Sequence, residues 1–250
     1  MVAEPVAALA QLIRASQPWV VLTGAGVSTE SGIPDFRSPT GLWAHVDPME
    51  YASLRAFRAD PAKVWRFYAP RIELLTGARP NAAHLALAEL ERSGLVAAVI
   101  TQNIDLLHER AGSREVVEVH GSIRTCSCPS CGAHYPLPEV LELLRSADAP
   151  ACPGCSAILK PDVVFFGELL SPEAIDRAFA LARSASLLLV VGSALDVHPV
   201  AGLPEETLAG GGKLAIVTIG ETPYDRQATL KIDGKAGQTL TGVLQELKAT

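Results

Sequence analysis

The spacing of apolar residues along the chain predicts buried strands that alternate with amphipathic helices. Short apolar runs rich in β-branched residues recur between stretches whose apolar positions have helical spacing. The runs that we expect to form strands are 19–23, 96–101, 116–119, 163–166, 187–191 and 214–219. Run 187–191 is apolar at every position, as expected for a parallel strand with helices on both faces. The pattern therefore predicts an α/β fold with a doubly wound parallel sheet.

Helix start and stop signals lie in the intervals between these runs. Asp60 followed by Pro61 is typical of a helix start, as are Ser171 and Pro172, which offer a capping hydroxyl and a first-turn proline. Gly94 is typical of a residue just beyond a helix end. These signals support the alternation of strands and helices.

Composition changes this picture by excluding several classes of protein. The apolar runs are much shorter than the ~18–20 residues that cross a bilayer. The first residues predict an amphipathic helix that contains Glu4 and Pro5, which argues against a signal peptide. The formal net charge is −6, and the 21 lysine and arginine residues are scattered without a basic run. We therefore expect a cytoplasmic protein that binds neither membranes nor nucleic acid directly.

Five cysteines lie in a stretch that interrupts the alternation of strands and helices. Four of them form two C-x2-C pairs, Cys128 with Cys131 and Cys152 with Cys155, a spacing that can bring four thiolates to one zinc ion. Four cysteines leave no open coordination position, so the zinc is expected to be structural. Cys126 is an alternative ligand to Cys128, but Cys128 gives both pairs the same Cys-Pro-x-Cys form.

A glycine-containing loop at residues 24–28 follows the first predicted strand. In this position backbone N–H groups can approach a pyrophosphate closely. Thr29 takes the sixth position of the usual G-x-G-x-x-G pattern, and no acidic ribose reader is evident about twenty residues further on. By itself the loop fits either dinucleotide binding or a plain turn, and it argues against an ordinary dehydrogenase.

Polar side chains follow two of the predicted strands at their carboxyl ends. Gln102, Asn103 and Asp105 come after the second run, and His120 comes directly after the third. Ligands of open α/β sheets bind at this edge. Histidine has an ordinary pKa close to neutrality, which suits proton transfer. His120 is therefore our candidate general base, whereas we expect the other five histidines to be structural.

These motifs, in this order, resemble the signature of the sirtuin family, of the bacterial type. The resemblance covers nearly the whole chain. It rests on residues 24–28, on Gly-Ile-Pro-Asp-Phe-Arg at 32–37, on Thr-Gln-Asn-Ile-Asp at 101–105, on His120 with Gly121, and on the two cysteine pairs.

The resemblance implies a Rossmann-like NAD-binding domain with two additions. The domain would comprise residues 1–120 and 161–250, with a helical insertion at about 40–78. Residues 121–160 would form a small inserted zinc module. The distance from His120 to Cys128 also resembles the usual spacing of the family, which again favours Cys128 over Cys126.

The activity that the resemblance implies is NAD-dependent deacylation of protein lysines, with NAD as co-substrate. The acyl oxygen of a modified lysine would attack the nicotinamide ribose, giving free lysine, nicotinamide and O-acyl-ADP-ribose. His120 would deprotonate the ribose, Asn103 would orient the ribose or a water, Ile104 and Asp105 would hold the nicotinamide amide, and Phe36 would shield the ribose. The residues implied to bind NAD are Gly24, Ala25, Gly26, Ser28, Thr29, Asp35, Phe36, Arg37, Gln102, Asn103, Ile104, Asp105, Gly192, Ser193, Ala194, Thr218 and Ile219.

Run 163–166 resembles the sirtuin segment that pairs with the substrate peptide as an added strand. We assign this contact to Val163, Phe165 and Phe166. Main-chain pairing accepts any extended peptide, so the expected partners are acylated lysine side chains of other proteins, held with little sequence selectivity.

Tyr68 and Arg71 stand three residues apart on the helix predicted to start at Asp60. This spacing places them on one helix face. A similar Tyr-x-x-Arg marks sirtuins that prefer succinyl- or malonyl-lysine, because the planar fork of arginine suits a carboxylate. Pro70 is expected to distort the helix. The alternative is that both side chains are simply solvated.

Two stretches depart from the family pattern on the side expected to bind adenosine. Ser193 and Ala194 stand where Thr and Ser are common, and Thr218 stands where an Asn usually precedes the Gly-Glu-Thr-Pro run. The loss of a hydroxyl and of an amide predicts weaker NAD binding, not a different cofactor.

Three other functions fit parts of the pattern. A zinc-containing dehydrogenase needs an acidic ribose reader and a hydride relay, and neither is evident. A mono-ADP-ribosyltransferase would use the same NAD site with a different acceptor and without acyl transfer. A non-catalytic NAD sensor would not require His120 or the intact Gln102–Asp105 cluster.

Overall fold

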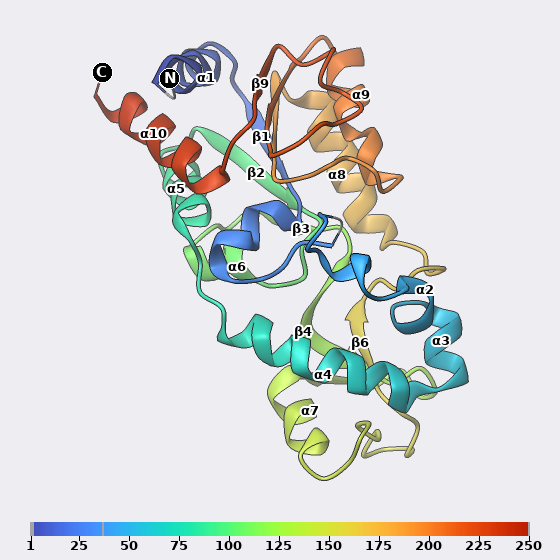
Figure 1. The fold of residues 1–250 in the computed structure, drawn as a ribbon. Coiled ribbons are helices and arrows are strands. Elements are labelled where there is room, and N and C mark those ends of the chain that lie inside the picture. Colours follow the sequence, from blue (N-terminus) through green and yellow to red (C-terminus); the bar gives the residue numbers. More distant parts are fainter. Residues whose placement is uncertain (1–2, 37, 250) are drawn as a thin grey trace.

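A six-stranded parallel sheet forms the centre of the structure, a computed structural model that describes residues 3–36 and 38–249 (Figure 1). The strand order is β3-β2-β1-β7-β8-β9, so the chain starts in the middle, builds one half outwards and then returns to build the other. All neighbouring strands run parallel. The strands are β1 Trp19–Thr23, β2 Val96–Thr101, β3 Val116–Glu118, β7 Leu187–Val191, β8 Lys213–Val217 and β9 Leu230–Ile232. The predicted doubly wound α/β fold is confirmed.

One predicted strand was wrong. Residues 163–166 do not form a strand of the parallel sheet: β6 covers Lys160–Val163 and belongs to a second sheet. Phe166 N–H instead donates to Ala52 O at 2.8 Å, and Leu54 N–H donates to Phe166 O at 3.0 Å. Val163 and Phe165 are apolar because they pack into a second core, not because helices cover both faces of the run, whereas Phe166 is exposed. Strand β9 was not predicted, because a three-residue strand with a lysine at its centre has too weak an apolar pattern.

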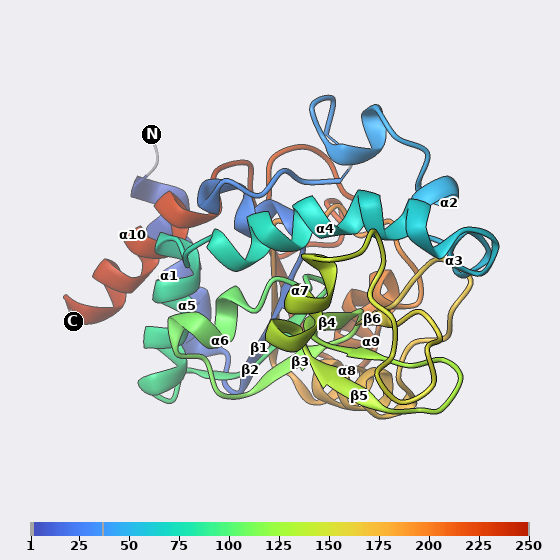
Figure 2. The same ribbon diagram turned by 90° about the horizontal axis from the view of Figure 1, so that it is seen from below.

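Helices cover both faces of the parallel sheet (Figure 1, Figure 2). Because side chains alternate along a strand, Val21 and Val99 belong to one core, whereas Leu22 and Ile100 belong to the other. This two-sided burial is why the strands are apolar at successive positions. The first face carries α1 Ala3–Ala15, α5 Ala82–Arg92 and α10 Ala236–Lys248, and the second carries α8 Pro172–Ser184 and α9 Leu203–Ala209.

A smaller, three-stranded antiparallel sheet lies beside a set of helices at one end of the molecule (Figure 1). Its strand order is β5-β4-β6. Trp65 is fully buried between the two, and its indole N–H donates to Leu159 O at 2.7 Å. The helices and the cysteine-containing segment therefore share one apolar core. The elements are β4 Gly121–Ser127, β5 His134–Pro136, α7 Leu137–Leu144, α2 Pro48–Tyr51, α3 Leu54–Ala59 and α4 Pro61–Gly77.

The predicted helix starts are confirmed by their caps. The Asp60 carboxylate accepts from Lys63 N–H at 2.9 Å at the start of α4, and the Ser171 hydroxyl accepts from Ala174 N–H at 3.3 Å at the start of α8. Helix α4 continues through Pro70, which is exposed, so the expected distortion does not interrupt it. The remaining elements are α6 Leu107–Ala111 and the 3-10 segments η1 Ala25–Ser31, η2 Leu42–Ala44 and η3 Val200–Gly202. No helix in the described ranges combines the length and the apolar character that a membrane crossing requires.

Candidate active site and metal centre

The loop after β1 and the loop after β7 interlock at the carboxyl edge of the sheet, where its strand order reverses. Gly24 N–H donates to Val191 O at 3.1 Å, and Gly26 N–H donates to Gly192 O at 2.8 Å. A Cβ at residue 26 would lie 2.8 Å from the backbone of Gly192, which itself has φ +62°. The close approach of the two loops therefore requires glycine at these positions, independently of any ligand.

The hydroxyl of Ser28 is the centre of a buried hydrogen-bond network beneath this loop. It donates to Asp105 Oδ2 at 2.7 Å, accepts from Asn103 Nδ2 at 3.0 Å and lies 3.4 Å from His84 Nε2. Asn81 N–H donates to His84 Nδ1 at 3.3 Å, so the His84 proton is on Nε2 and points to Ser28. One hydroxyl therefore joins three polar side chains that lie far from it in the sequence.

The same network fixes the orientation of Asn103 and Asp105. The side-chain amide of Asn103 donates to Gly24 O at 3.2 Å as well as to Ser28, so its Oδ1 is the atom that can accept from a ligand. Asp105 Oδ1 accepts from Leu107 N–H at 2.9 Å. Both side chains are buried, and neither can rotate without breaking these bonds.

Two buried histidines lie next to this network, with ring centroids 4.8 Å apart. Burial lowers the pKa of His84 to about 4, against the opposing effect of Asp105. Burial and the proximity of His84 lower the pKa of His108 to about 3. His108 Nε2 lies 2.9 Å from Thr23 Oγ1, whose own proton goes to Thr101 Oγ1. His108 Nε2 is therefore a donor, and both rings are neutral at physiological pH, consistent with the structural role expected for them.

His120 lies between the parallel sheet and the smaller sheet. Its Nδ1 is 3.1 Å from Gln102 O, and its own backbone O accepts from Val164 N–H at 2.9 Å. The next residue, Gly121, has φ +71°, and a Cβ there would lie 2.1 Å from Asp162 O. A carbonyl oxygen only accepts hydrogen bonds, so Nδ1 carries the proton and Nε2 has the lone pair that can take up another.

Gln102 connects this part of the edge to the loop after β7. Its Nε2 donates to Ser193 Oγ at 2.8 Å, and that oxygen also accepts from Leu195 N–H at 3.2 Å. Further along the edge, Thr218 is buried, whereas Ala194 and Ile219 are exposed. The residues predicted to bind the two halves of NAD thus lie along one continuous edge of the sheet.

The loop that follows the glycines is anchored to the helical segment by stacked aromatic rings. Phe36 stacks on Trp43 at 5.4 Å between ring centroids, and Trp43 stacks on Phe67 at 6.3 Å. Asp35 Oδ1 accepts from Ser38 N–H at 2.8 Å. Of the other residues predicted to contact NAD, Ala25 and Thr29 lie in η1 and Ile104 is partly buried, whereas Arg37 lies outside the described residues.

Tyr68 and Arg71 lie on the same side of α4 and interact. Burial raises the pKa of the Tyr68 phenol well above its ordinary value, and the nearby Arg71 charge partly opposes this. Burial lowers the pKa of Arg71. The Arg71 guanidinium lies 3.5 Å above the Phe67 ring, and Tyr68 packs on Phe165 at 5.2 Å between centroids. These two side chains are therefore fixed by packing and not freely solvated.

The segment assigned to substrate binding differs in detail from the prediction. Val163 and Phe165 are buried in the second core, and both backbone polar groups of Phe166 are used by Ala52 and Leu54. The residues from Gly167 onwards lie outside the predicted run and outside the pairing with Ala52 and Leu54.

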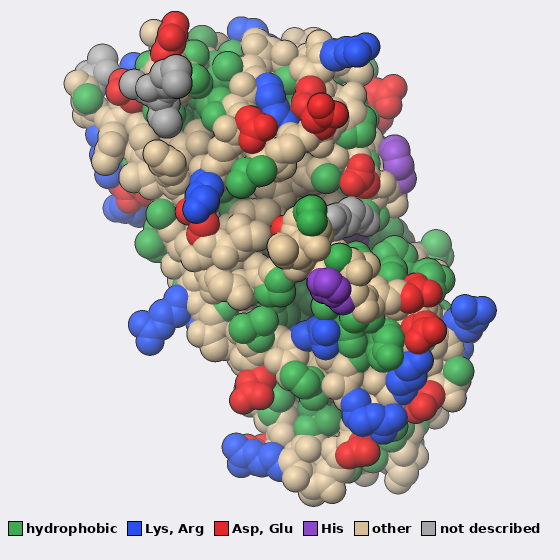
Figure 3. Space-filling view, in the orientation of Figure 1, with side chains coloured by type: hydrophobic (Ala, Val, Ile, Leu, Met, Phe, Trp, Pro, Cys, Tyr) green, Lys and Arg blue, Asp and Glu red, His purple; other side chains and the backbone are tan. Residues whose placement is uncertain are grey.

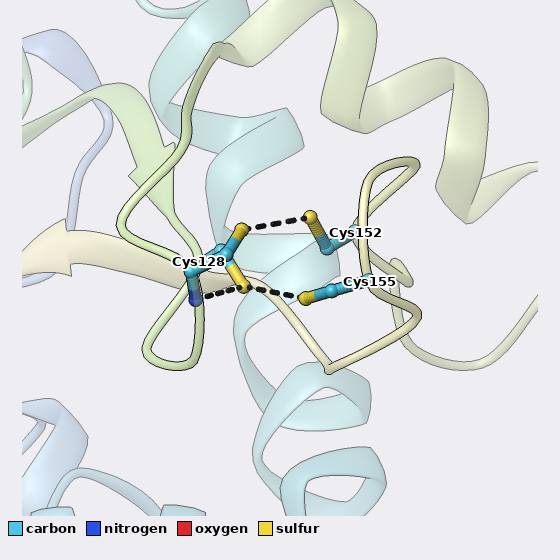
Figure 4. Close-up of side chains that lie close together, drawn as sticks. Cys128, Cys152 and Cys155 are labelled. Carbon is cyan, nitrogen blue, oxygen red and sulfur yellow. Dashed lines mark hydrogen bonds between the residues drawn. The ribbon is translucent and has the colours of Figure 1, made fainter.

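The four predicted cysteines come together although two loops supply them (Figure 4). Their Sγ atoms all lie within 4.8 Å of one another, with Cys128 3.4 Å from Cys155 and Cys131 3.7 Å from Cys152. A tetrahedral zinc ion with Zn–S bonds of about 2.3 Å requires sulfurs roughly 3.8 Å apart. The set therefore fits one zinc ion. Cys126 lies outside it as a buried thiol whose pKa burial raises to about 12.

Sequence reasoning missed a second anchor of the glycine loop. Glu30 Oε2 accepts from Gly237 N–H at 2.8 Å, at the start of α10. A carboxylate at the positive end of a helix is favourable. Residues so far apart carry no common pattern, so this contact had no signal in the sequence.

The space-filling view shows a recess between the larger and the smaller part of the molecule (Figure 3). Hydrophobic side chains gather along its walls. Such a hollow at the carboxyl edge of an open α/β sheet is the usual place for a ligand.

Comparison with known proteins gives one consistent result. A model described as the Sir2 family matches residues 24–199. The chain is 44% identical over 235 residues to an NAD-dependent protein deacetylase of Thermotoga maritima, covering 94% of this chain and 95% of that protein. It is 43% identical over 240 residues to NAD-dependent protein deacylase 1 of Archaeoglobus fulgidus, covering 96% and 97%.

A solved Sir2 structure that contains a deacetylated peptide and 3'-O-acetyl ADP ribose superposes with a TM-score of 0.92. Its sequence identity is 43%, and the match covers 96% of this chain and 97% of that one.

Proposed function

We infer that this chain, which belongs to the Sir2 family, is an NAD-dependent protein-lysine deacylase. It releases nicotinamide from NAD and transfers the acyl group of a modified lysine to ADP-ribose. Its protein substrates are acylated lysine side chains, bound within extended peptides. The observation that carries this conclusion is the position of His120 beside the Ser28, Asn103 and Asp105 network, in a chain that matches such enzymes along nearly its full length.

His120 acts in this proposal as the general base. The hydrogen bond from Nδ1 to Gln102 O selects the tautomer whose Nε2 accepts a proton. That nitrogen removes a proton from a ribose hydroxyl of NAD, so that the hydroxyl can take up the acyl group. Correctly placed general bases contribute about 10² to 10⁴ in rate.

Asn103 and Asp105 hold the reacting part of NAD. Oδ1 of Asn103 orients the ribose or a water, because its amide hydrogens are used by Gly24 and Ser28. Asp105, together with Ile104, binds the nicotinamide amide through the lone pairs that Ser28 and Leu107 leave on its carboxylate. NAD itself supplies a leaving group that is cationic before the reaction, so the site must mainly position it and exclude water.

The remaining NAD contacts form two groups. The residues near the phosphates and the nicotinamide ribose are Gly24, Ala25, Gly26, Ser28, Thr29, Asp35, Phe36, Arg37 and Gln102. The residues near the adenosine are Gly192, Ser193, Ala194, Thr218 and Ile219. We propose that Phe36, fixed by its stack on Trp43, shields the ribose from solvent.

The substrate peptide pairs with the backbone from Gly167 onwards. Phe166 cannot offer its own N–H and C=O, because Ala52 and Leu54 occupy them. Val163 and Phe165 would then hold this part of the backbone in place through their packing in the second core.

We propose that Tyr68 and Arg71 favour acyl chains that end in a carboxylate, such as succinyl or malonyl. The two side chains are held on one side of α4 by packing against Phe165 and Phe67. An arginine already in place loses little freedom when it binds a carboxylate. Acetyl-lysine lacks that carboxylate and would gain nothing from Arg71.

The zinc centre has a structural role in this proposal. Four cysteine ligands leave no position for substrate or water. The ion would hold together the two loops of a module at residues 121–160, while residues 1–120 and 161–250 form the NAD-binding domain. All five cysteines are free thiols, which fits a reducing compartment, and we propose that the protein is cytoplasmic.

Product analysis by mass spectrometry tests the function. The protein is incubated with NAD and matched acetyl-lysine and succinyl-lysine peptides, with His120→Ala as a control. We expect nicotinamide and O-acyl-ADP-ribose from the wild type only. ADP-ribosylated protein without acyl transfer would instead indicate a mono-ADP-ribosyltransferase, and intact NAD would indicate a binding protein.

A further inference from the structure

The hydroxyl of Tyr135 lies beside one cysteine of the metal centre. Tyr135 Oη is 3.3 Å from Cys152 Sγ. Tyr135 is on β5, where it pairs across the sheet with Cys126 of β4, and its side chain is half-buried. It therefore reaches from the sheet that flanks the first cysteine pair to the loop that carries the second.

The chemistry of this contact fixes its direction. A cysteine bound to zinc is a thiolate, which accepts hydrogen bonds and cannot donate. A phenol has an ordinary pKa near 10 and keeps its proton at neutral pH. When the ion is bound, Tyr135 must therefore donate to Cys152.

The charge of the centre makes such a donor favourable. Four thiolates around one Zn²⁺ carry a net charge of −2, and hydrogen bonds to the sulfurs spread that charge. Cys128 Sγ accepts from the backbone N–H of Cys131 at 3.5 Å, a contact made within its own loop. Among the described residues other than the four cysteines, Tyr135 is the one whose side chain forms a hydrogen bond with these sulfurs.

We propose that Tyr135 is a positioning residue of the metal centre, which strengthens zinc binding by donating a hydrogen bond to the Cys152 thiolate. The inference rests on the zinc ion proposed above and goes beyond it, because it assigns a role to a residue that is not a ligand.

The test compares Tyr135→Phe with the wild type in a zinc competition assay with a chelator. Groups that bond to metal ligands typically contribute 10- to 100-fold to metal affinity, and we expect a loss in this range. Tyr51→Phe is the matched control, because it removes a phenol from a ring that stacks on Phe67, away from the cysteines. Circular dichroism of both variants verifies the fold.

A spectroscopic measurement separates hydrogen bonding from packing. The zinc is replaced by Co²⁺, and the thiolate-to-cobalt charge-transfer absorption is recorded. A hydrogen bond lowers the energy of the sulfur lone pairs, so its removal in Tyr135→Phe should move this absorption to lower energy. Tyr135→His, which restores an N–H donor, should move it back. Tyr135→Leu, which also lacks a donor, replaces Tyr135→Phe if that variant does not fold.

The outcomes distinguish the two proposals. A wild type that binds no zinc overturns the metal centre and this inference with it. A wild type that binds one zinc ion, with affinity and absorption unchanged in Tyr135→Phe, overturns the role of Tyr135 alone.

Discussion

The Nδ1 atom of His120 lies 3.1 Å from the backbone carbonyl oxygen of Gln102, and this contact decides which ring nitrogen carries the proton. Gln102 is itself fixed, because its N–H donates to Thr23 O at 3.0 Å and its side chain donates to Ser193. The ring of His120 is thereby coupled to the ends of β1 and β7. This geometry makes Nε2 the proton acceptor of the site.

Replacing His120 by alanine should remove deacylation while leaving the fold intact. The loss of a general base predicts a fall in kcat of about 10² to 10⁴, or more if the imidazole also orients NAD. Mass spectrometry of O-acyl-ADP-ribose measures it. His134→Ala, which removes an exposed histidine of β5, is the control and should retain activity. Near-normal turnover in His120→Ala would exclude His120 from the mechanism.

Replacing Arg71 by methionine should reduce desuccinylation far more than deacetylation. The charged hydrogen bonds to a carboxylate are worth about 1.5–3 kcal/mol, which predicts a loss of roughly 10- to 100-fold in kcat/KM for a succinylated peptide. The same peptide in acetylated form provides the internal comparison. Arg66→Met, an exposed position on the same helix, should leave both activities unchanged. Equal losses on the two peptides would contradict a role of Tyr68 and Arg71 in binding the carboxylate of the acyl chain.

Replacing Ser28 by alanine should weaken the structure as well as NAD binding. His84 Nε2 and Asn103 Nδ2 lose an acceptor and Asp105 loses a donor, and one unsatisfied buried group costs about 1–3 kcal/mol. Urea unfolding measures the stability, and the KM for NAD should rise in parallel. The surface variant Ser146→Ala should change the unfolding free energy by less than about 0.5 kcal/mol. A Ser28→Ala protein as stable as the wild type would show that the network contributes little.

Stability should fall between pH 7 and pH 5 because of two buried histidines. His84 and His108 have pKa values of about 4 and about 3 in the folded chain, against an ordinary value of 6.5. The unfolded state therefore binds more protons in this window, so the unfolding free energy decreases as the pH falls below 6.5. At pH 5 each histidine predicts a loss of about 2 kcal/mol.

Urea unfolding at several pH values checks this slope. His84→Gln keeps an amide donor and acceptor but does not titrate, and it should flatten the slope. The exposed His45→Gln should leave it unchanged. A wild-type stability that is constant from pH 7 to pH 5 contradicts the prediction.

Strands β1, β2 and β7 could be predicted to the residue, because burial on both faces of the sheet produces nearly continuous apolar runs. Run 163–166 was misassigned because its buried side chains, Val163 and Phe165, pack into a different core. Local composition reports that a segment is buried, but it does not report which elements bury it.

The kinds of chemistry available to this protein can be predicted from its sequence, because the glycine loop, the polar cluster at 102–105, His120 and the two cysteine pairs are short motifs whose spacing is set by local geometry. How these groups act on one another depends on the tertiary structure. Several features of the site depend on contacts between residues far apart in the chain. They are the hydrogen bonds that Asn103 and Ser28 donate, the tautomer of His120, the pairing of the Phe166 backbone with Ala52 and Leu54, and the contact of Tyr135 with Cys152. Such contacts follow from how the strands and the two cores are packed, and no local pattern of side chains encodes them.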